Sequence, residues 1–182
     1  MALKLPRAIR LDPSDTFVFD RPAQPGEWVV SGAFMFVGRD LDNLGTKERV
    51  AFRSGLLGVD SFGWSTLAIV TEIGEEEYRN VLETFAQRIH EVFNAPTIGA
   101  ARGAALEELT FAISLCDHPP QTLLAVQRTF EHGEIRERFR TIAPKEDFSK
   151  GGFKVFTFEA STEAEPPAEE IDFMHLSKER TP

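Results

Sequence analysis

Two amphipathic segments in the middle of the chain restrict its possible folds more than any other feature. From Glu75 to Phe93, apolar residues recur every three or four positions, which predicts a helix with one apolar face. Three glutamates in its first turn suit the positive end of the helix dipole. After Pro96, the residues from Ile98 to Cys116 predict a second helix, whose small side chains allow close packing and which two prolines end.

Segments with high β-propensity lie on both sides of this helix pair. Before it, we expect a short strand near residues 8–11 and four further strands, at Thr16–Phe19, Glu27–Val37, Glu48–Leu57 and Gly63–Ile73. After it, we expect a hairpin and then a last strand at Gly152–Ala160. This order of elements, with strands before and after two consecutive helices, predicts an α+β fold. In this fold a mostly antiparallel sheet packs on the two helices.

The hairpin is predicted in detail at Thr122–Ile142, with His132-Gly133 as its two-residue turn. Pairing the residues next to the turn puts four apolar side chains on one face of the hairpin: Val126, Phe130, Ile135 and Phe139. Arg128 then lies opposite Glu137 on this apolar face. We interpret that pair as structural.

The length and composition indicate one domain with an acidic extension. The 182 residues suffice for a single core, and we place the α+β domain at residues 1–160. Residues 161–182 are rich in Glu and Pro, so we expect a flexible acidic tail there. Its apolar patch, Ile171–Leu176, could dock on another surface.

Charge and cysteine content bear on partners and location. The net charge of −9 argues against binding to nucleic acid, whose phosphates attract basic surfaces. The single cysteine fits a reducing compartment. We find no apolar stretch long enough for a signal peptide or a membrane span, which needs about 18–20 residues. These features predict a soluble cytoplasmic protein.

Four residues around the second helix are candidates for a metal site. His and Cys are ligands that zinc and related metals prefer, and carboxylates complete such sites. The candidate ligands are His90, Glu108, Cys116 and His118. Glu108 falls between two apolar stripes of the helix, so partial burial would raise its pKa and suit acid–base chemistry. The alternative is a buried structural cysteine, a surface glutamate and a histidine at the helix end.

The second candidate site is the face of the hairpin opposite the apolar one. Arg136, Arg138 and Arg140 alternate along one strand, so all three project from the same side. Guanidinium groups in a row suit the recognition of phosphates or carboxylates. The bound group could belong to a small anion, an acidic protein or the acidic tail of this chain. The alternative is a solvated face whose charges protect a strand edge from aggregation.

Two stretches carry a family resemblance: Arg7–Asp12, and Phe34 through Gly58 into residues 62–66. On these residues the chain resembles an uncharacterised alphaproteobacterial family of unknown function that covers nearly the whole chain. The resemblance implies no activity, ligand or catalytic residue.

No catalytic or nucleotide-binding signature occurs in the sequence. We therefore expect a non-enzymatic binding or accessory protein that acts through protein contacts, with the arginine face and the apolar patch of the tail as docking features. Two alternatives stay open. One is a small metal-binding protein or metal-dependent enzyme that uses the second helix. The other is a small-molecule-binding domain with a pocket between sheet and helices. The sequence indicates no particular cofactor or oligomeric state.

Overall fold

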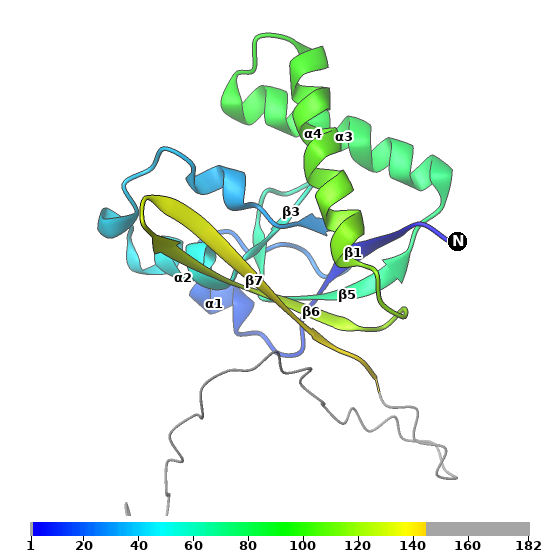
Figure 1. Cartoon of the computed structure of the whole chain (residues 1–182), viewed down its shortest axis with the longest axis horizontal. Coiled ribbons are helices and arrows are strands. Elements are labelled where there is room, and N and C mark those ends of the chain that lie inside the picture. Colours follow the sequence, from blue (N-terminus) through cyan, green and yellow to red (C-terminus); the bar gives the residue numbers. More distant parts are fainter. Residues whose placement is uncertain (1, 145–182) are drawn as a thin grey trace, which may run out of the picture.

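The chain combines antiparallel sheets with a pair of long helices in a computed structural model that describes residues 2–144 (Figure 1). Its strands are β1 (Lys4–Ile9), β2 (Val29–Val30), β3 (Leu56–Gly58), β4 (Trp64–Ser65), β5 (Leu67–Glu72), β6 (Leu123–Glu131) and β7 (Glu134–Ile142). Its helices are α1 (Asp15–Val18), α2 (Thr46–Ser54), α3 (Glu75–Phe93) and α4 (Ile98–Leu115), with two short 3-10 helices, η1 (Ala33–Phe36) and η2 (Leu41–Asn43). This is the α+β fold that the sequence predicts.

The strands form two antiparallel sheets that meet at β1 and β2. The larger sheet has the order β1-β5-β6-β7, and the smaller has the order β2-β3-β4. A bridge between Arg7 and Trp28 joins them, together with a hydrogen bond of 2.7 Å from the Ala8 amide to the Glu27 carbonyl. The two sheets therefore continue into each other.

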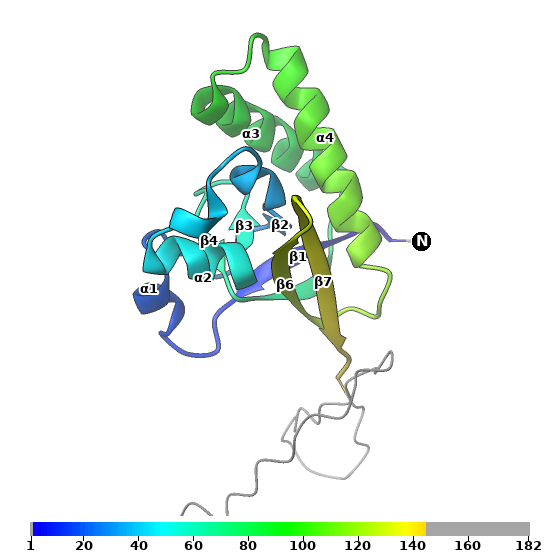
Figure 2. The same cartoon turned by 60° about the vertical axis from the view of Figure 1, so that its left-hand side comes forward.

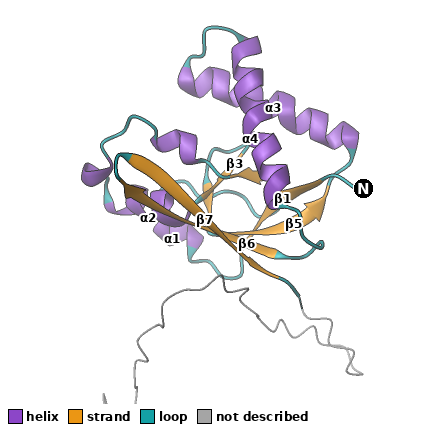
Figure 3. Ribbon diagram, viewed as in Figure 1, coloured by secondary structure: helices purple, strands orange, loops and turns teal. Residues whose placement is uncertain are grey.

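Helices α3 and α4 lie together on one side of the strands, and α1 and α2 lie apart from this helix pair (Figures 2 and 3). One apolar cluster connects this helix pair to both sheets. Its members from the sheets include Leu5, Val30 and Leu57, and its members from the helices include Phe85 and Leu109. Burial of this shared core fixes the helix pair on the sheets.

Helix α3 has the predicted bounds, and α4 begins as predicted but ends at Leu115, one residue before the predicted end. α3 stops at Asn94, whose φ of 51° is left-handed and ends the helical path. α4 begins after Thr97, whose side chain accepts a hydrogen bond of 3.0 Å from the Ala100 amide. Cys116 forms the C-terminal cap of α4.

Helices replace two of the predicted strands. α1 lies where a strand was expected at Thr16–Phe19, because Asp12 accepts a hydrogen bond of 2.8 Å from the Ser14 amide and starts a turn. α2 covers most of the strand expected at Glu48–Leu57. There the Glu48 carboxylate accepts a hydrogen bond of 3.3 Å from the Gly45 amide and closes the first turn.

The strand expected at Glu27–Val37 shrinks to the two residues of β2, because the chain turns at Gly32. Its φ is +80°, and a Cβ there would lie 2.6 Å from the Cβ of Leu57, so only glycine fits this approach. η1 follows in place of the strand. The strand expected at Gly63–Ile73 is split into β4 and β5, and the first strand, β1, lies earlier than residues 8–11.

The β6–β7 hairpin has the predicted turn and register. Glu131 pairs with Glu134 and Arg128 with Glu137, as the apolar pattern requires. Only the first two residues of β6 pair with β5, through Leu123 and Leu124. The rest of the hairpin extends past β5 toward α2 (Figure 1). The predicted strand at residues 152–160 and the predicted tail lie outside the described residues. Within residues 2–144, no helix has the length and apolar character needed to cross a membrane.

Candidate functional site

The β6–β7 hairpin has two chemically different faces, one turned to the protein and one to solvent. Its tight turn requires left-handed backbone at both central residues, and His132 (φ 53°) and Gly133 (φ 79°) supply it. Because side chains alternate along a strand, every second residue of β6 and β7 points to the same face. The inward face anchors the hairpin, and the outward face is the candidate site.

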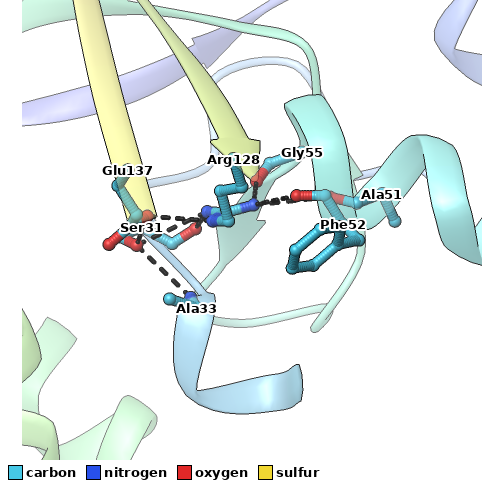
Figure 4. Close-up of polar contacts among 7 residues, drawn as sticks. All are labelled: Ser31, Ala33, Ala51, Phe52, Gly55, Arg128 and Glu137. Carbon is cyan, nitrogen blue, oxygen red and sulfur yellow. Dashed lines mark hydrogen bonds and ion pairs between the residues drawn. The ribbon is translucent and has the colours of Figure 1, made fainter. Parts of the chain in front are cut away.

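Arg128 anchors the inward face and has a fully buried side chain. Its Nε donates to Glu137 Oε2 at 2.9 Å, and its Nη1 donates to the carbonyls of Gly55 at 2.7 Å and Phe52 at 3.1 Å. Its Nη2 donates to the carbonyl of Ser31 (Figure 4). Since Phe52 belongs to the last turn of α2, the guanidinium satisfies carbonyls that a helix end leaves unpaired.

This network holds the inward face of the hairpin in place. Burial lowers the pKa of Arg128, while the charge of Glu137 and its hydrogen bond raise it. The Ser31 hydroxyl donates to the same Glu137 carboxylate, but Ser31 and Arg128 are each only 1% exposed. No substrate can reach a serine in that position. The network joins the far end of the hairpin to α2 and to the residue after β2.

Glu108 of α4 is half-buried near this network, as its position between two apolar stripes predicts. Burial, together with the negative charges of Glu137 and Glu107, raises its pKa to about 7, against a smaller opposing effect of Arg128. The side chain is therefore partly protonated near neutral pH.

The outward face of the hairpin carries the three arginines that the sequence singles out. Arg136, Arg138 and Arg140 are all exposed, on alternate positions of β7. Arg136 lies 3.5 Å from the Glu131 carboxylate, and Arg140 donates to the side chain of Gln127 at 3.3 Å. These contacts extend the guanidinium groups across the face of the hairpin.

An open groove of about 520 Å³ follows this face. Its lining comes from both strands of the hairpin: Gln127, Thr129, Glu131, Arg136, Glu137 and Arg138. In this lining Gln127 and Thr129 are neutral, Glu131 and Glu137 are anionic, and Arg136 and Arg138 supply the positive charge. The two guanidinium groups are suited to bind carboxylates or phosphates.

The four candidate metal ligands do not come together. His90 lies in the last turn of α3, and the His118 carbonyl accepts a hydrogen bond of 2.6 Å from Lys4 Nζ. Cys116 is buried, and burial raises the pKa of its thiol to about 12. Among residues 2–144, no three His, Cys, Asp or Glu side chains are placed to share a metal ion.

A second groove, of about 470 Å³, lies between the sheet side of the molecule and α3. Trp28 and Val59 line it on one side, and Asn80, Val81 and Thr84 of α3 line it on the other. A pocket between sheet and helices is one of the alternatives that the sequence leaves open, but these lining residues could not be identified from the sequence. No motif marks them, because they are far apart in the chain and meet only in the folded protein.

Comparisons with known proteins give one match. The model of a family of unknown function, DUF6505, matches residues 1–161. No curated protein and no solved structure matches the chain. The match confirms the resemblance to a family of unknown function that extends over nearly the whole chain.

Proposed function

The chain belongs to the family DUF6505, and we propose that it is a non-enzymatic binding protein whose arginine face recognises an acidic segment of a partner protein. The arginine face is the outward surface of β7 with Arg136, Arg138 and Arg140. The observation that carries the proposal is this row of exposed cations in a chain whose net charge is −9. A local positive surface on an acidic protein selects negatively charged partners.

The geometry of the row favours an extended partner. Side chains on alternate strand positions are about 6.8 Å apart, which is also the repeat of alternate side chains in an extended peptide. Each guanidinium can bind a carboxylate through two parallel hydrogen bonds. Because β7 ends the strand order of the larger sheet within the described residues, main-chain pairing of a partner strand could add to these contacts.

Binding of an acidic peptide tests this function. The measurement is the fluorescence anisotropy of a labelled peptide of alternating Glu and Ala, titrated with the full chain at low and high salt. We expect saturable binding that weakens at high salt. Replacing all three arginines of the face by Gln should weaken binding by about a hundredfold, since each of the three removed charge-assisted contacts contributes about 1 kcal/mol.

A matched variant controls for the loss of positive charge. Lys47, Arg79 and Arg102 are exposed and lie on α2, α3 and α4, away from β7. Replacing these three by Gln changes the net charge equally and should leave binding within about twofold. Equal losses in the two triple variants would show that overall charge, rather than the arginine face, holds the peptide. Absence of binding by the unaltered chain and by all variants would refute the function.

A second candidate function rests on the groove beside Trp28. Its volume of about 470 Å³ falls within the usual range for small-molecule sites. This observation favours a small-molecule-binding domain. A ligand bound there should raise the melting temperature of the protein, and Thr84→Arg should abolish the rise by filling the groove. A metabolite screen with no shift in the unaltered protein would count against this candidate.

Two finer predictions accompany these proposals. The cytoplasmic location rests on the lone cysteine, which fits a reducing compartment. The alphaproteobacterial range of the family rests on the sequence resemblance. Assistance to a larger enzyme, through contacts between the two proteins, would agree with the proposed role of this chain as a binding protein.

A further inference from the structure

We propose that the acidic segment at residues 159–172 of this chain binds its own arginine face and competes with the external partner. The competition rests on the proposed function, whereas the intramolecular contact does not. Three observations point to this segment: its charge, the place where the described chain ends, and the form of the groove.

Charge complementarity singles out one part of the sequence. Residues 155–177 contain no lysine or arginine, and they carry six carboxylates: Glu159, Glu163, Glu165, Glu169, Glu170 and Asp172. Elsewhere on the protein, Arg39, Arg88 and Arg102 each pair with a carboxylate within 3 Å. The arginine face presents three guanidinium groups in one row.

The described part of the chain ends close to the arginine face. β7 ends at Ile142, and Arg140 is only two residues before that end. Glu163 therefore follows Arg140 by only 23 residues of sequence. Arg136 and Arg140 are about 14 Å apart along the strand. Because the segment and the arginine face belong to one chain, their association is intramolecular and does not depend on the protein concentration.

The groove then determines which ligand is displaced. It runs along the outward face of the hairpin and is lined by Arg136 and Arg138. A carboxylate bound to these residues occupies the position that an external carboxylate would need. Intramolecular binding therefore lowers the apparent affinity for the partner without changing the contacts that the partner makes.

Paramagnetic relaxation measures the intramolecular contact directly. A nitroxide is attached to Ala168→Cys in the full chain, with Cys116→Ala present so that only one thiol reacts. We expect the amide signals of residues 135–141 to broaden most, and to recover at high salt. The control carries the same label in the variant whose three face arginines are Gln, where the broadening of β7 should disappear. Broadening that is absent from β7, or equal in both proteins, would overturn the proposal.

Peptide affinity measures the competition. In the full chain, five acidic residues are neutralised together: Glu163→Gln, Glu165→Gln, Glu169→Gln, Glu170→Gln and Asp172→Asn. We expect this variant to bind the Glu–Ala peptide at least about threefold more tightly than the unaltered chain. Equal affinity would overturn the competition and leave the proposed function standing. If neither protein binds the peptide, the function fails, and relaxation alone decides whether the tail contacts the face.

Discussion

Arg128 has the largest fully buried side chain among the described residues, and its replacement gives a quantitative prediction. Arg128→Met removes a buried cation that donates to Glu137 and to carbonyls of Ser31, Phe52 and Gly55. Methionine fills part of the volume but donates no hydrogen bond. The Glu137 carboxylate, only 18% exposed, then lacks its counter-ion.

The expected cost follows from this loss of partners. Removing one member of a buried ion pair destabilises a protein by about 3–5 kcal/mol, because the remaining charge stays desolvated. A domain of this size has a free energy of unfolding of about 5–15 kcal/mol. At about 2–4 °C per kcal/mol, Arg128→Met should lower the melting temperature by about 10 °C. The melting temperature of Arg128→Lys should fall between those of the unaltered protein and Arg128→Met, since an ammonium keeps the charge but cannot match the fork of guanidinium donors.

Urea unfolding followed by tryptophan fluorescence measures these free energies, and a double-mutant cycle isolates the ion pair. Adding Glu137→Leu to Arg128→Met removes the unpaired carboxylate, so the double variant should be more stable than Arg128→Met alone. Arg102→Met is the control, because the Arg102 pair with Glu83 is exposed and contributes about 1 kcal/mol at most. A cost below about 1 kcal/mol for Arg128→Met would refute the anchoring role of Arg128.

Three further predictions concern single sites elsewhere in the fold. Because the native pKa of Glu108 (about 7) exceeds its ordinary value of 4.5, the folded state binds an extra proton between these pH values, and stability falls as pH rises through them. Glu108→Gln should flatten this dependence of the urea midpoint on pH, and an unchanged slope would contradict it. Gly32→Ala should destabilise the protein by about 2–4 kcal/mol in the same assay, because its Cβ would approach Leu57 and the Trp64 ring within 3 Å; an unchanged midpoint would argue against that packing. Cys116 should resist iodoacetamide at about pH 8 in the native protein and react in urea, and mass spectrometry would reveal native alkylation if its burial were wrong.

The elements that were correctly predicted are those with a long, uninterrupted pattern. The apolar stripe of α3 extends over 19 residues, and the hairpin has a turn and a register that support each other. The elements before Trp64 were predicted less accurately. Their apolar runs are short, so helix and strand periods cannot be told apart there. Local turn chemistry at Gly32 and Gly45 then determined the outcome.

The candidate site was predictable only where it follows from strand alternation. The row of Arg136, Arg138 and Arg140 required no tertiary information, because alternate residues of one strand share a face. The pairing of Arg128 with Glu137 followed from the register, but its contacts with α2 depend on residues more than 70 positions away. The candidate metal set illustrates the same limit of sequence spacing, since the separation of His90 and Cys116 along the chain does not fix their distance in space.

Chemical-shift mapping tests the central claim most directly, because it locates the bound ligand on the protein. The Glu–Ala peptide is titrated into the isotope-labelled full chain with the five acidic tail positions neutralised, and amide shifts are followed by NMR. The account predicts saturable shifts concentrated in residues 125–141 of the β6–β7 hairpin, lost when the three face arginines are Gln. Shifts centred on another surface, such as the α3–α4 turn or the groove beside Trp28, would contradict it.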